Sequence, residues 1–365
     1  MKIVTVIGAR PQFIKAAAVS NKLREKFMEI LIHTGQHYDE NMSDIFFREL
    51  DLPVPDYNLQ VGSGSHAKQT ADIMVGVEEV LIKEKPDYLL VYGDTNSTLA
   101  AALAASKLLI PVVHIEAGLR SFNMEMPEEQ NRILTDHISS ILFCSTETAV
   151  NNLYNENIID NVYNVGDVMC DSVLYFTKKI KKISQEYFIN KLNYLYPWSQ
   201  VLKKWYLATI HRVENTKNIE SIEEILTAFE ELDNPVIFPV HPRIRTYINC
   251  LCKEKHYKNI CFVEPMGYLE MLYFSKNAIK IITDSGGLQK EAYLLETNVV
   301  TIREQTEWIE TLLGNHNVLC KRNKEEIINA VNRKDIDTEF NKIIYGEGNT
   351  GKKICDILKI NMKDI

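Results

Sequence analysis

The sequence predicts an α/β protein with two doubly wound parallel sheets that follow one another along the chain. Short apolar runs of strand length alternate with segments of helical periodicity, as in βαβ units. This rhythm ends near Gly166 and starts again at Trp205. The chain has 365 residues, more than one compact core usually organises, so two domains are expected.

The first module begins with the apolar strand "KIVTVI", and "GARPQFIK" then turns into a helix that extends to about Leu23. The next elements continue the alternation: strand 29–34, helix 42–50, helix 66–85 before Pro86, strand 87–94, helix 98–109, and strands 111–118, 141–146 and 162–167. We expect a first domain of residues 1–168, completed by a C-terminal helix at residues 349–365.

Residues 176–205 have helical spacing but no strand pattern, and their basic run is more simply a solvated helix face than an anion site. The alternation then returns in a second set of elements. Its strands are "WYLATIHR", "PVIFPVHPR", "NICFVEP", "KIITDSGG" and "NVVTIRE", and its helices are "SIEEILTAFEEL", "YLEMLYFSKNA" and "LQKEAYLLE". We expect this second domain to span residues 169–348.

The composition, 45% hydrophobic and 25% charged, is that of a soluble globular protein. A net charge of −8 argues against a nucleic-acid partner, because phosphate backbones are held by Lys and Arg. No apolar run is long enough for a membrane span, and the first is too short for a signal peptide, so we expect a cytoplasmic protein. The seven scattered cysteines are expected to be free thiols, and no spacing suggests a metal site.

In doubly wound sheets, ligands bind beyond the carboxyl ends of the strands. Polar residues follow the apolar strands at these positions: Arg10, Asp94, Glu116, His211, His241 and Ser285. The motif "TDSGGLQKEA" is the most informative, because small residues and free amides at a helix N-terminus can hold a phosphate or diphosphate. A tight turn between strand and helix is the alternative.

Two further sets of residues suit an anionic ligand. Arg10 and Lys15 in "GARPQFIKAA" are the cations that a diphosphate needs, unless they are solvated charges on a capped helix. His211 in "TIHRVEN" and His241 in "PVHPR" end strands of the same module, where they suit anion binding or proton donation, although a lone histidine is more often structural.

Carboxylates gather in the first module. Asp94 in "VYGDTNST" is either a helix N-cap or, with Glu116 on the neighbouring strand, one of an acid and base pair. Glu128 adds a third acid, although "MPEEQNRI" also has the features of a helix start. We expect Glu125 to be solvated and Glu129 to be the weaker candidate beside Glu128.

The ordered motifs "GARPQFIK", "GQHYD", "YGDTNSTLA", "HIEAGLRS", "PEEQNR", "HRVEN", "PVHPR" and "TDSGGLQKEA" resemble those of the non-hydrolysing UDP-N-acetylglucosamine 2-epimerases through nearly the whole chain. The resemblance implies a GT-B-like fold, with two Rossmann-type domains, an active site between them, and a homodimer. It also implies loss of the C2 proton as UDP departs anti, an enzyme-bound 2-acetamidoglucal, and re-addition of UDP. Neither a nicotinamide cofactor nor a catalytic metal is implied.

The family's roles fall on matching residues of this sequence. The resemblance implies acid/base roles for Asp94, Glu116 and Glu128, and support of the departing diphosphate by His211. The implied substrate contacts are Arg10 and Lys15 with the nucleotide sugar, Ser285, Gly286 and Gly287 with the diphosphate, and Glu291 with the ribose.

The sequence departs from better-known members at three places. Met266 and Met271 stand near the expected uracil site in place of glutamine and phenylalanine. In "TEWIE", Trp308 replaces an arginine ligand, which leaves Arg303 as the matching cation. The motifs "GARPQFIKA", "SFNMEMPEEQNRILTD" and "TEWIE" resemble the branch that includes UDP-2,3-diacetamido-2,3-dideoxyglucuronate 2-epimerases.

We therefore predict conversion of UDP-N-acetylglucosamine to UDP-N-acetylmannosamine for polysaccharide synthesis. The same chemistry on a diacetamido uronic acid nucleotide is the nearest alternative. A GT-B glycosyltransferase and a non-catalytic nucleotide-sugar sensor are alternatives of other classes.

Overall fold

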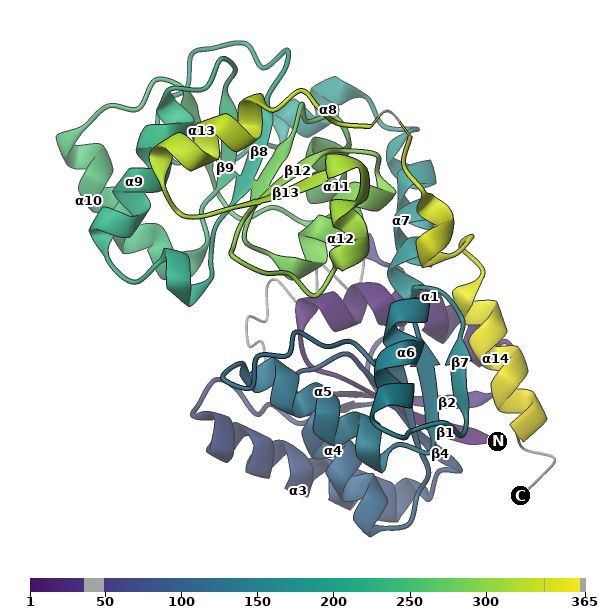
Figure 1. Ribbon diagram of the computed structural model, residues 1–365. Helices are drawn as coiled ribbons and strands as arrows, with labels where there is room; N and C mark the ends of the chain where they lie inside the picture. The colour runs from purple at the N-terminus through teal and green to yellow at the C-terminus, as the bar shows by residue number, and fades with distance from the viewer. Residues whose placement is uncertain (36–48, 338, 362–365) are drawn as a thin grey trace. The chain divides into compact units, whose positions relative to one another are not determined.

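The computed structural model describes residues 1–35, 49–337 and 339–361, and these form two compact units (Figure 1). Unit 1 is Met1–Leu174 with Ile343–Ile365, and unit 2 is Tyr175–Lys342. We expected the boundaries at 168/169 and 348/349. The structure divides the chain elsewhere because the start of the boundary helix packs with unit 1, where Ser172 Oγ donates to the Ile14 carbonyl at 2.8 Å.

Unit 1 contains a seven-stranded parallel sheet in the order β3-β2-β1-β4-β5-β6-β7. Its strands are β1 (Lys2–Ile7), β2 (Met28–His33), β3 (Tyr57–Asn58), β4 (Tyr88–Tyr92), β5 (Val112–Ala117), β6 (Ile141–Cys144) and β7 (Val162–Asn164). Its helices are α1 (Arg10–Arg24), α3 (His66–Glu84), α4 (Asn96–Lys107), α5 (Pro127–Ile138), α6 (Glu147–Asn155), α14 (Thr350–Asn361) and the first half of α7 (Val168–Ile180).

The sheet of unit 1 is covered on both faces, which is why most residues of its central strands are buried and apolar. Val4 and Val6 of β1 pack with α3 and α4 in one hydrophobic core. Alternate residues of the same strand face the other way, where α1 lies beside α14 (Figure 1). The expected strand at 2–7 and the expected C-terminal helix are therefore present. The expected helix at 42–50 and the motif "GQHYD" lie largely outside the described residues.

Unit 2 repeats the architecture with a six-stranded parallel sheet in the order β10-β9-β8-β11-β12-β13. Its strands are β8 (Tyr206–Thr209), β9 (Val236–Pro239), β10 (Ile260–Val263), β11 (Ile281–Thr283), β12 (Val299–Ile302) and β13 (Asn317–Cys320). Its helices are the second half of α7, α8 (Gln185–Asn190), α9 (Ile219–Glu230), α10 (Arg245–Glu254), α11 (Tyr268–Lys276), α12 (Gly286–Leu294) and α13 (Lys324–Asn332). A second hydrophobic core lies between this sheet and α9, α10 and α13.

Each sheet reverses its strand order once, and these reversals locate the candidate site. In unit 1 the order turns at β1 and β4, and in unit 2 it turns at β8 and β11. At such a switch point the loops after the two central strands diverge and leave a crevice at the strand ends. The polar motifs of the sequence follow these four strands.

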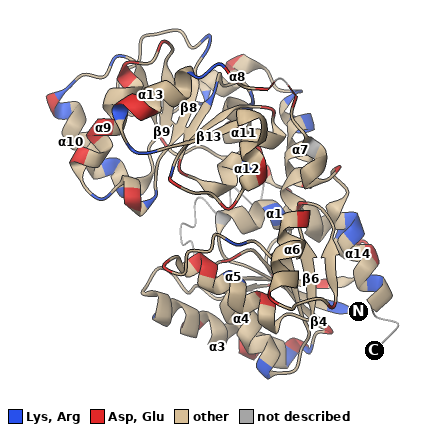
Figure 2. Ribbon diagram, in the orientation of Figure 1, with Lys and Arg blue, Asp and Glu red and all other residues tan. Residues whose placement is uncertain are grey.

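Helix hydrophobicity and the distribution of surface charge complete the description of the fold. None of the helices among the described residues is both long and apolar enough to cross a membrane. Figure 2 shows acidic and basic residues interspersed on both units.

Candidate active site

Asp94 lies in the turn after β4, where Gly93 has a φ of +62°. The carboxylate of Asp94 accepts from Arg132 Nη2 at 2.6 Å and Nε at 3.0 Å, and its carbonyl accepts from Asn131 Nδ2 at 2.9 Å. The N-cap of α4 is Thr95, whose hydroxyl accepts from the Thr98 amide. The N-cap alternative for Asp94 is therefore wrong, and its half-buried carboxylate is held by α5.

Glu116 has an unusual backbone conformation. Its φ of 72° lies in the left-handed region, and the register between β5 and β6 slips between Ile115 and Ala117. Within the described ranges, Glu116 is the one non-glycine residue with positive φ that lies inside a strand. Such conformations are disfavoured by side-chain sterics and gather at functional sites.

A buried ion pair holds the Glu116 side chain. Lys15 Nζ, from α1, donates to Glu116 Oε2, and both side chains are almost fully buried. A β-carbon placed on Gly93 would lie 3.2 Å from Glu116 Oε2 and 3.4 Å from Lys15 Nζ. The structure thus brings Lys15, Glu116 and the Asp94 turn together, and the glycine permits their close approach.

Glu128 and Glu129 begin α5, so the helix-start alternative is correct for the backbone. Glu128 is exposed in the first turn. Glu129 is fully buried and accepts from the amides of Ser121 and Phe122 and from Arg132 Nη1. Burial alone would raise the pKa of Glu129, but these hydrogen bonds outweigh it and lower the pKa. Glu129 therefore shapes the loop, and Glu125 is exposed as expected.

Gln12 joins the two loops at the switch point of unit 1. Its carbonyl accepts from the amides of Gly8 and Ala9, and its Nε2 donates to the Tyr92 carbonyl at 2.8 Å. The sequence analysis did not single out this residue. The sequence shows only a glutamine directly before apolar residues in the first turn of a helix. This pattern is too common to indicate a function.

Asp284 performs the corresponding task in unit 2. Its buried carboxylate accepts from the amides of His211 and Arg212 and from Asn215 Nδ2. His211 Nδ1 also lies 3.3 Å from Asp284 Oδ1. The loop after β8 is therefore anchored to the residue that precedes Ser285. This role was also missed, although a charged residue directly after the apolar β11 strand was a usable clue.

His211 is half-buried above this anchor, and its ring stacks on that of His241 with 5.5 Å between centroids. Burial lowers the pKa of His211, and the charges of Arg212 and Arg243 act in the same direction, whereas Asp284 opposes them. His211 is therefore neutral at pH 7 in the unliganded protein. The exposed His241 accepts from the Arg243 amide.

Ser285, Gly286 and Gly287 form the start of α12 as expected. The N-cap Ser285 makes no side-chain capping hydrogen bond. A β-carbon on Gly286 would lie 2.2 Å from Glu307 Oε1, whereas one on Gly287 would meet nothing within 4 Å. The helix start thus has one closed side and one open side, and the open side suits an anion.

The closed side is lined by residues of the "TEWIE" motif. Glu307 accepts from Arg303 Nη1 at 3.0 Å, and its other oxygen lies 4.0 Å from Arg212 Nη2. Trp308 is buried, and the equally buried Lys290 places its Nζ 4.0 Å from the ring centroid. This distance is that of a cation–π contact between Lys290 and Trp308.

The remaining expected ligands are three residues of unit 2 and Arg10 of unit 1. Glu291 is buried one turn into α12, Met266 is buried just before α11, and Met271 is half-buried in the first turn of α11. Arg10 begins α1, but its side chain lies outside the described residues. Among the described residues, no group of three or more His, Cys, Asp or Glu side chains is arranged to hold a metal ion.

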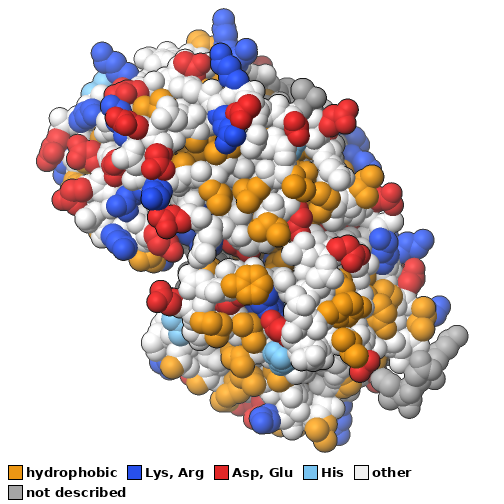
Figure 3. All heavy atoms as spheres, in the orientation of Figure 1, with side chains coloured by type: hydrophobic (Ala, Val, Ile, Leu, Met, Phe, Trp, Pro, Cys, Tyr) orange, Lys and Arg blue, Asp and Glu red, His pale blue; other side chains and the backbone are white. Residues whose placement is uncertain are grey.

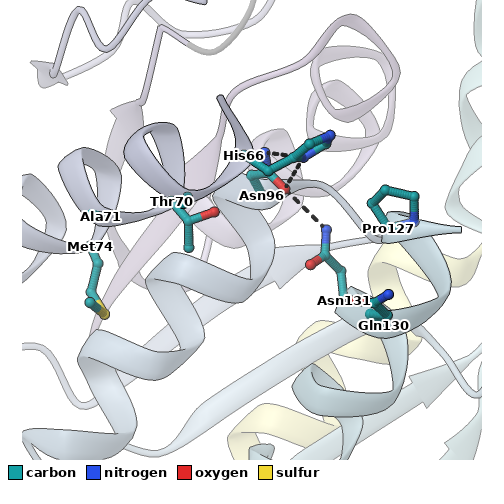
Figure 4. Close-up of a pocket in the computed structure, with 9 residues that line it drawn as sticks. His66, Thr70, Ala71, Met74, Asn96, Pro127, Gln130 and Asn131 are labelled. Carbon is teal, nitrogen blue, oxygen red and sulfur yellow. Dashed lines mark hydrogen bonds between the residues drawn. The ribbon is translucent and has the colours of Figure 1, made fainter. Parts of the chain in front are cut away.

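A cavity of about 530 Å³ lies beside the Asp94 turn, lined by α3, α4 and α5 (Figure 4). Ala71, Met74 and Pro127 supply apolar surface. Asn96 and Asn131 face each other in Figure 4, with Asn131 Nδ2 3.4 Å from Asn96 Oδ1. Asn131 also holds the Asp94 carbonyl, so this cavity borders the carboxylate site without including its acids.

Comparisons with known proteins agree with this geometry. Residues 20–359 match the family model described as UDP-N-acetylglucosamine 2-epimerase. A "UDP-N-acetylglucosamine 2-epimerase homolog" of Methanococcus maripaludis is 53% identical, over 98% of this chain and 99% of the relative. The UDP-2,3-diacetamido-2,3-dideoxy-D-glucuronate 2-epimerase of Pseudomonas aeruginosa is 45% identical, also over 98% of this chain and 99% of the relative.

A solved structure extends the likeness to three dimensions. The Methanocaldococcus jannaschii UDP-GlcNAc 2-epimerase, crystallised with UDP-GlcNAc and UDP, matches with a TM-score of 0.88 and 42% identity, over 99% of this chain and 100% of that chain. Together with the two parallel sheets, this confirms the expected GT-B-like fold of two Rossmann-type domains.

Proposed function

The chain belongs to the UDP-N-acetylglucosamine 2-epimerase family, and from this premise we propose that it inverts C2 of a UDP-N-acetyl-hexosamine. The simplest reaction of this kind converts UDP-N-acetylglucosamine to UDP-N-acetylmannosamine. The observation that carries the proposal is the left-handed, ion-paired Glu116 beside the Asp94 turn, because inversion at C2 needs a positioned acid and base.

Unit 2 binds the UDP moiety in this proposal. The open side of the α12 start, with Ser285, Gly286 and Gly287, receives the diphosphate, and His211 stabilises it as it departs. The remaining ligands are Glu291 for the ribose, Met266 and Met271 near the uracil, and Arg10, His241 and Arg303 for the anionic groups. The support is the position of Ser285, Gly286 and His211 at the switch point of the unit 2 sheet, whereas Arg10 begins α1 after the central strand β1 of unit 1.

Unit 1 carries out the proton transfers. A carboxylate takes the C2 proton, the electrons of the C2–H bond form the C1=C2 double bond, and the C1–O bond breaks with its electron pair on UDP. Reprotonation on the other face and return of UDP to C1 complete the inversion. Asp94, Glu116 and Glu128 are the acid/base groups, and Lys15, already paired with Glu116, contacts the nucleotide sugar.

A second sugar is a specific candidate. The Pseudomonas aeruginosa relative, at 45% identity over 98% of this chain, is named for UDP-2,3-diacetamido-2,3-dideoxy-D-glucuronate. The structure of the Methanocaldococcus jannaschii relative, at 42% identity, contains UDP-GlcNAc. A glycosyltransferase would need an acceptor and would have no use for paired acids at C2.

We further propose that the enzyme works in the cytoplasm and supplies polysaccharide synthesis. All seven cysteines are free thiols in the structure, which is usual in a reducing compartment.

The proposed enzyme is a homodimer, and apolar surface on unit 1 supports a contact there. Exposed hydrophobic side chains include Val75 and Ile82 of α3, Leu134 of α5 and Leu109 after α4. Because α4 packs against both α3 and α5, these residues belong to one layer of helices. Figure 3 shows hydrophobic side chains gathered over this part of unit 1.

Incubation in D2O with each nucleotide sugar tests the reaction. We expect deuterium at C2 of recovered substrate and product, detected by NMR, and the sugar that exchanges identifies the substrate. Asp94→Asn and Glu116→Gln should reduce exchange by at least about 100-fold while UDP still binds. The exposed Glu125→Gln is the matched control and should exchange normally. Absence of deuterium with both sugars in the wild type would sink the reaction class, and acceptor-dependent UDP release would indicate a transferase.

Two neighbouring glycines should respond differently to alanine. Gly287→Ala adds a methyl group to open space, so stability should hold or rise by up to about 1 kcal/mol, whereas UDP affinity falls because the methyl group occupies the anion position. Gly286→Ala collides with Glu307 and should lower the melting temperature. Thermal unfolding and calorimetric titration with UDP measure both effects. Unchanged UDP affinity in Gly287→Ala would contradict the assigned diphosphate position.

UDP should raise the pKa of His211. Burial lowers this pKa in the free protein, so the ring is neutral at pH 7, and a nearby diphosphate favours the protonated ring. NMR titration of the histidine Cε1–H resonance that is missing from His211→Asn measures the pKa with and without UDP. UDP affinity should fall as pH rises through the window between the two values. A pKa that UDP leaves unchanged or lowers would remove His211 from the diphosphate site.

A charge in the apolar layer should separate the dimer. Ile82→Glu buries a carboxylate at the proposed contact, so light scattering should report monomers where the wild type gives dimers. Val201→Glu, a similarly exposed aliphatic position in unit 2, is the control and should leave the dimer intact. A monomeric wild type, or a dimeric Ile82→Glu, would contradict the proposed interface.

A further inference from the structure

His114 lies fully buried inside β5, two residues before Glu116. Its ring spans two structural elements. Nδ1 lies 2.7 Å from Asp136 Oδ1 of α5, and Nε2 lies 2.8 Å from the Gly93 carbonyl in the turn after β4. These contacts tie the strand that carries Glu116 to the turn that carries Asp94 and to the helix that begins with Glu128.

The Nε2 atom of His114 acts as a hydrogen-bond donor. The Gly93 carbonyl can only accept, so Nε2 carries a hydrogen. Asp136 Oδ2 accepts from the Gly118 amide at 3.1 Å and from Arg120 Nη1 at 2.7 Å. Burial would raise the pKa of Asp136, but its contacts with His114 and Arg120 outweigh burial and lower the pKa.

The consequence falls on the peptide between Gly93 and Asp94. Its carbonyl is held by His114, while the free face of Gly93 lies against the Glu116 carboxylate and Lys15. Asp136 also fixes the Gly118 amide, so a single carboxylate holds the chain on both sides of the left-handed Glu116. Neither the His114 contact with Gly93 nor the Asp136 contact with Gly118 lies in the crevice itself.

We propose that His114 is a positioning residue for the C2 proton transfers. By donating to the Gly93 carbonyl, it holds the turn that carries Asp94, and so sets the distance between the Asp94 and Glu116 carboxylates. The inference rests on the proposed epimerase function. In this proposal the contact of His114 with Gly93 affects catalysis, whereas its contact with Asp136 affects only stability. A purely structural histidine would affect stability through both contacts.

Two amide replacements separate these contacts. The Nδ2 of asparagine falls near the position of the histidine Nδ1, so His114→Asn can keep the bond to Asp136 and loses the donor to Gly93. The Nε2 of glutamine falls near the histidine Nε2, so His114→Gln can keep the bond to Gly93 and loses the contact with Asp136. Both variants remove the same ring and leave similar volume, so each is the control for the other.

The proposal predicts that His114→Asn lowers kcat by on the order of 100-fold, because small misplacement of catalytic groups is costly. KM and the Kd for UDP should stay within about twofold, since unit 2 binds the nucleotide. His114→Gln should recover most of the lost kcat, even if its melting temperature is the lower of the two.

Activity is measured well below both melting temperatures, with circular dichroism to verify the fold. Equal kcat in the two variants, wild-type kcat in His114→Asn, or a parallel rise in KM and in the Kd for UDP would overturn the inference. These outcomes are distinct from failure of the proposed function, in which the wild type itself shows no exchange at C2 with any nucleotide sugar.

Discussion

The candidate site depends on buried polar side chains that satisfy the backbone groups of diverging loops. Where a parallel sheet reverses its strand order, the loops leave the sheet and their amides and carbonyls lose the partners that a ladder would provide. In unit 1, Gln12 accepts from two amides of one loop and donates to the strand end that precedes the other. In unit 2, Asp284 accepts from the His211 and Arg212 amides. Internal hydrogen bonds therefore hold the loops at each switch point, and fixed loops favour precise placement of the side chains that they carry.

Buried polar contacts of the same kind also hold Glu116 in its left-handed conformation. A left-handed glutamate is disfavoured and persists only where its surroundings determine it fully. Lys15 holds its carboxylate, and Asp136 holds His114 on one side and the Gly118 amide on the other. The positive φ of Glu116 coincides with the register shift at the end of β5, and the Glu116 side chain lies beside Gly93 in the turn after β4. The ion pair with Lys15 and the contacts of Asp136 on either side of Glu116 thus act together to fix the Glu116 carboxylate.

The sequence predicted the fold well and the site in part, and the division has a physical basis. Strands such as β1 and β4 are buried on both faces, so their apolar runs are visible without the structure. β3 and β13 lie at the edges of the two sheets and are only partly buried, so neither has the fully apolar run that identifies a buried strand. The strand-end rule placed Asp94, Glu116, His211 and Ser285 at or beside strand ends, as the structure has them, because these positions follow from topology. It could not find the Lys15–Glu116 pair, whose members are 101 residues apart, or the positive φ of Glu116, because both depend on tertiary packing.

Charge compensation resolves the difficulty of placing acids in a site for an anionic substrate. Carboxylates near a UDP-sugar would repel its diphosphate, and a low local dielectric would strengthen that repulsion. In unit 1 the two acids are each paired with a cation, Glu116 with Lys15 and Asp94 with Arg132. Arg132 also binds the fully buried Glu129, which keeps the guanidinium in place. In the proposed reaction, these two cations partly compensate the charges of Asp94 and Glu116. The same proposal has His211 gain a proton as negative charge develops on departing UDP, so that positive charge arises at that step.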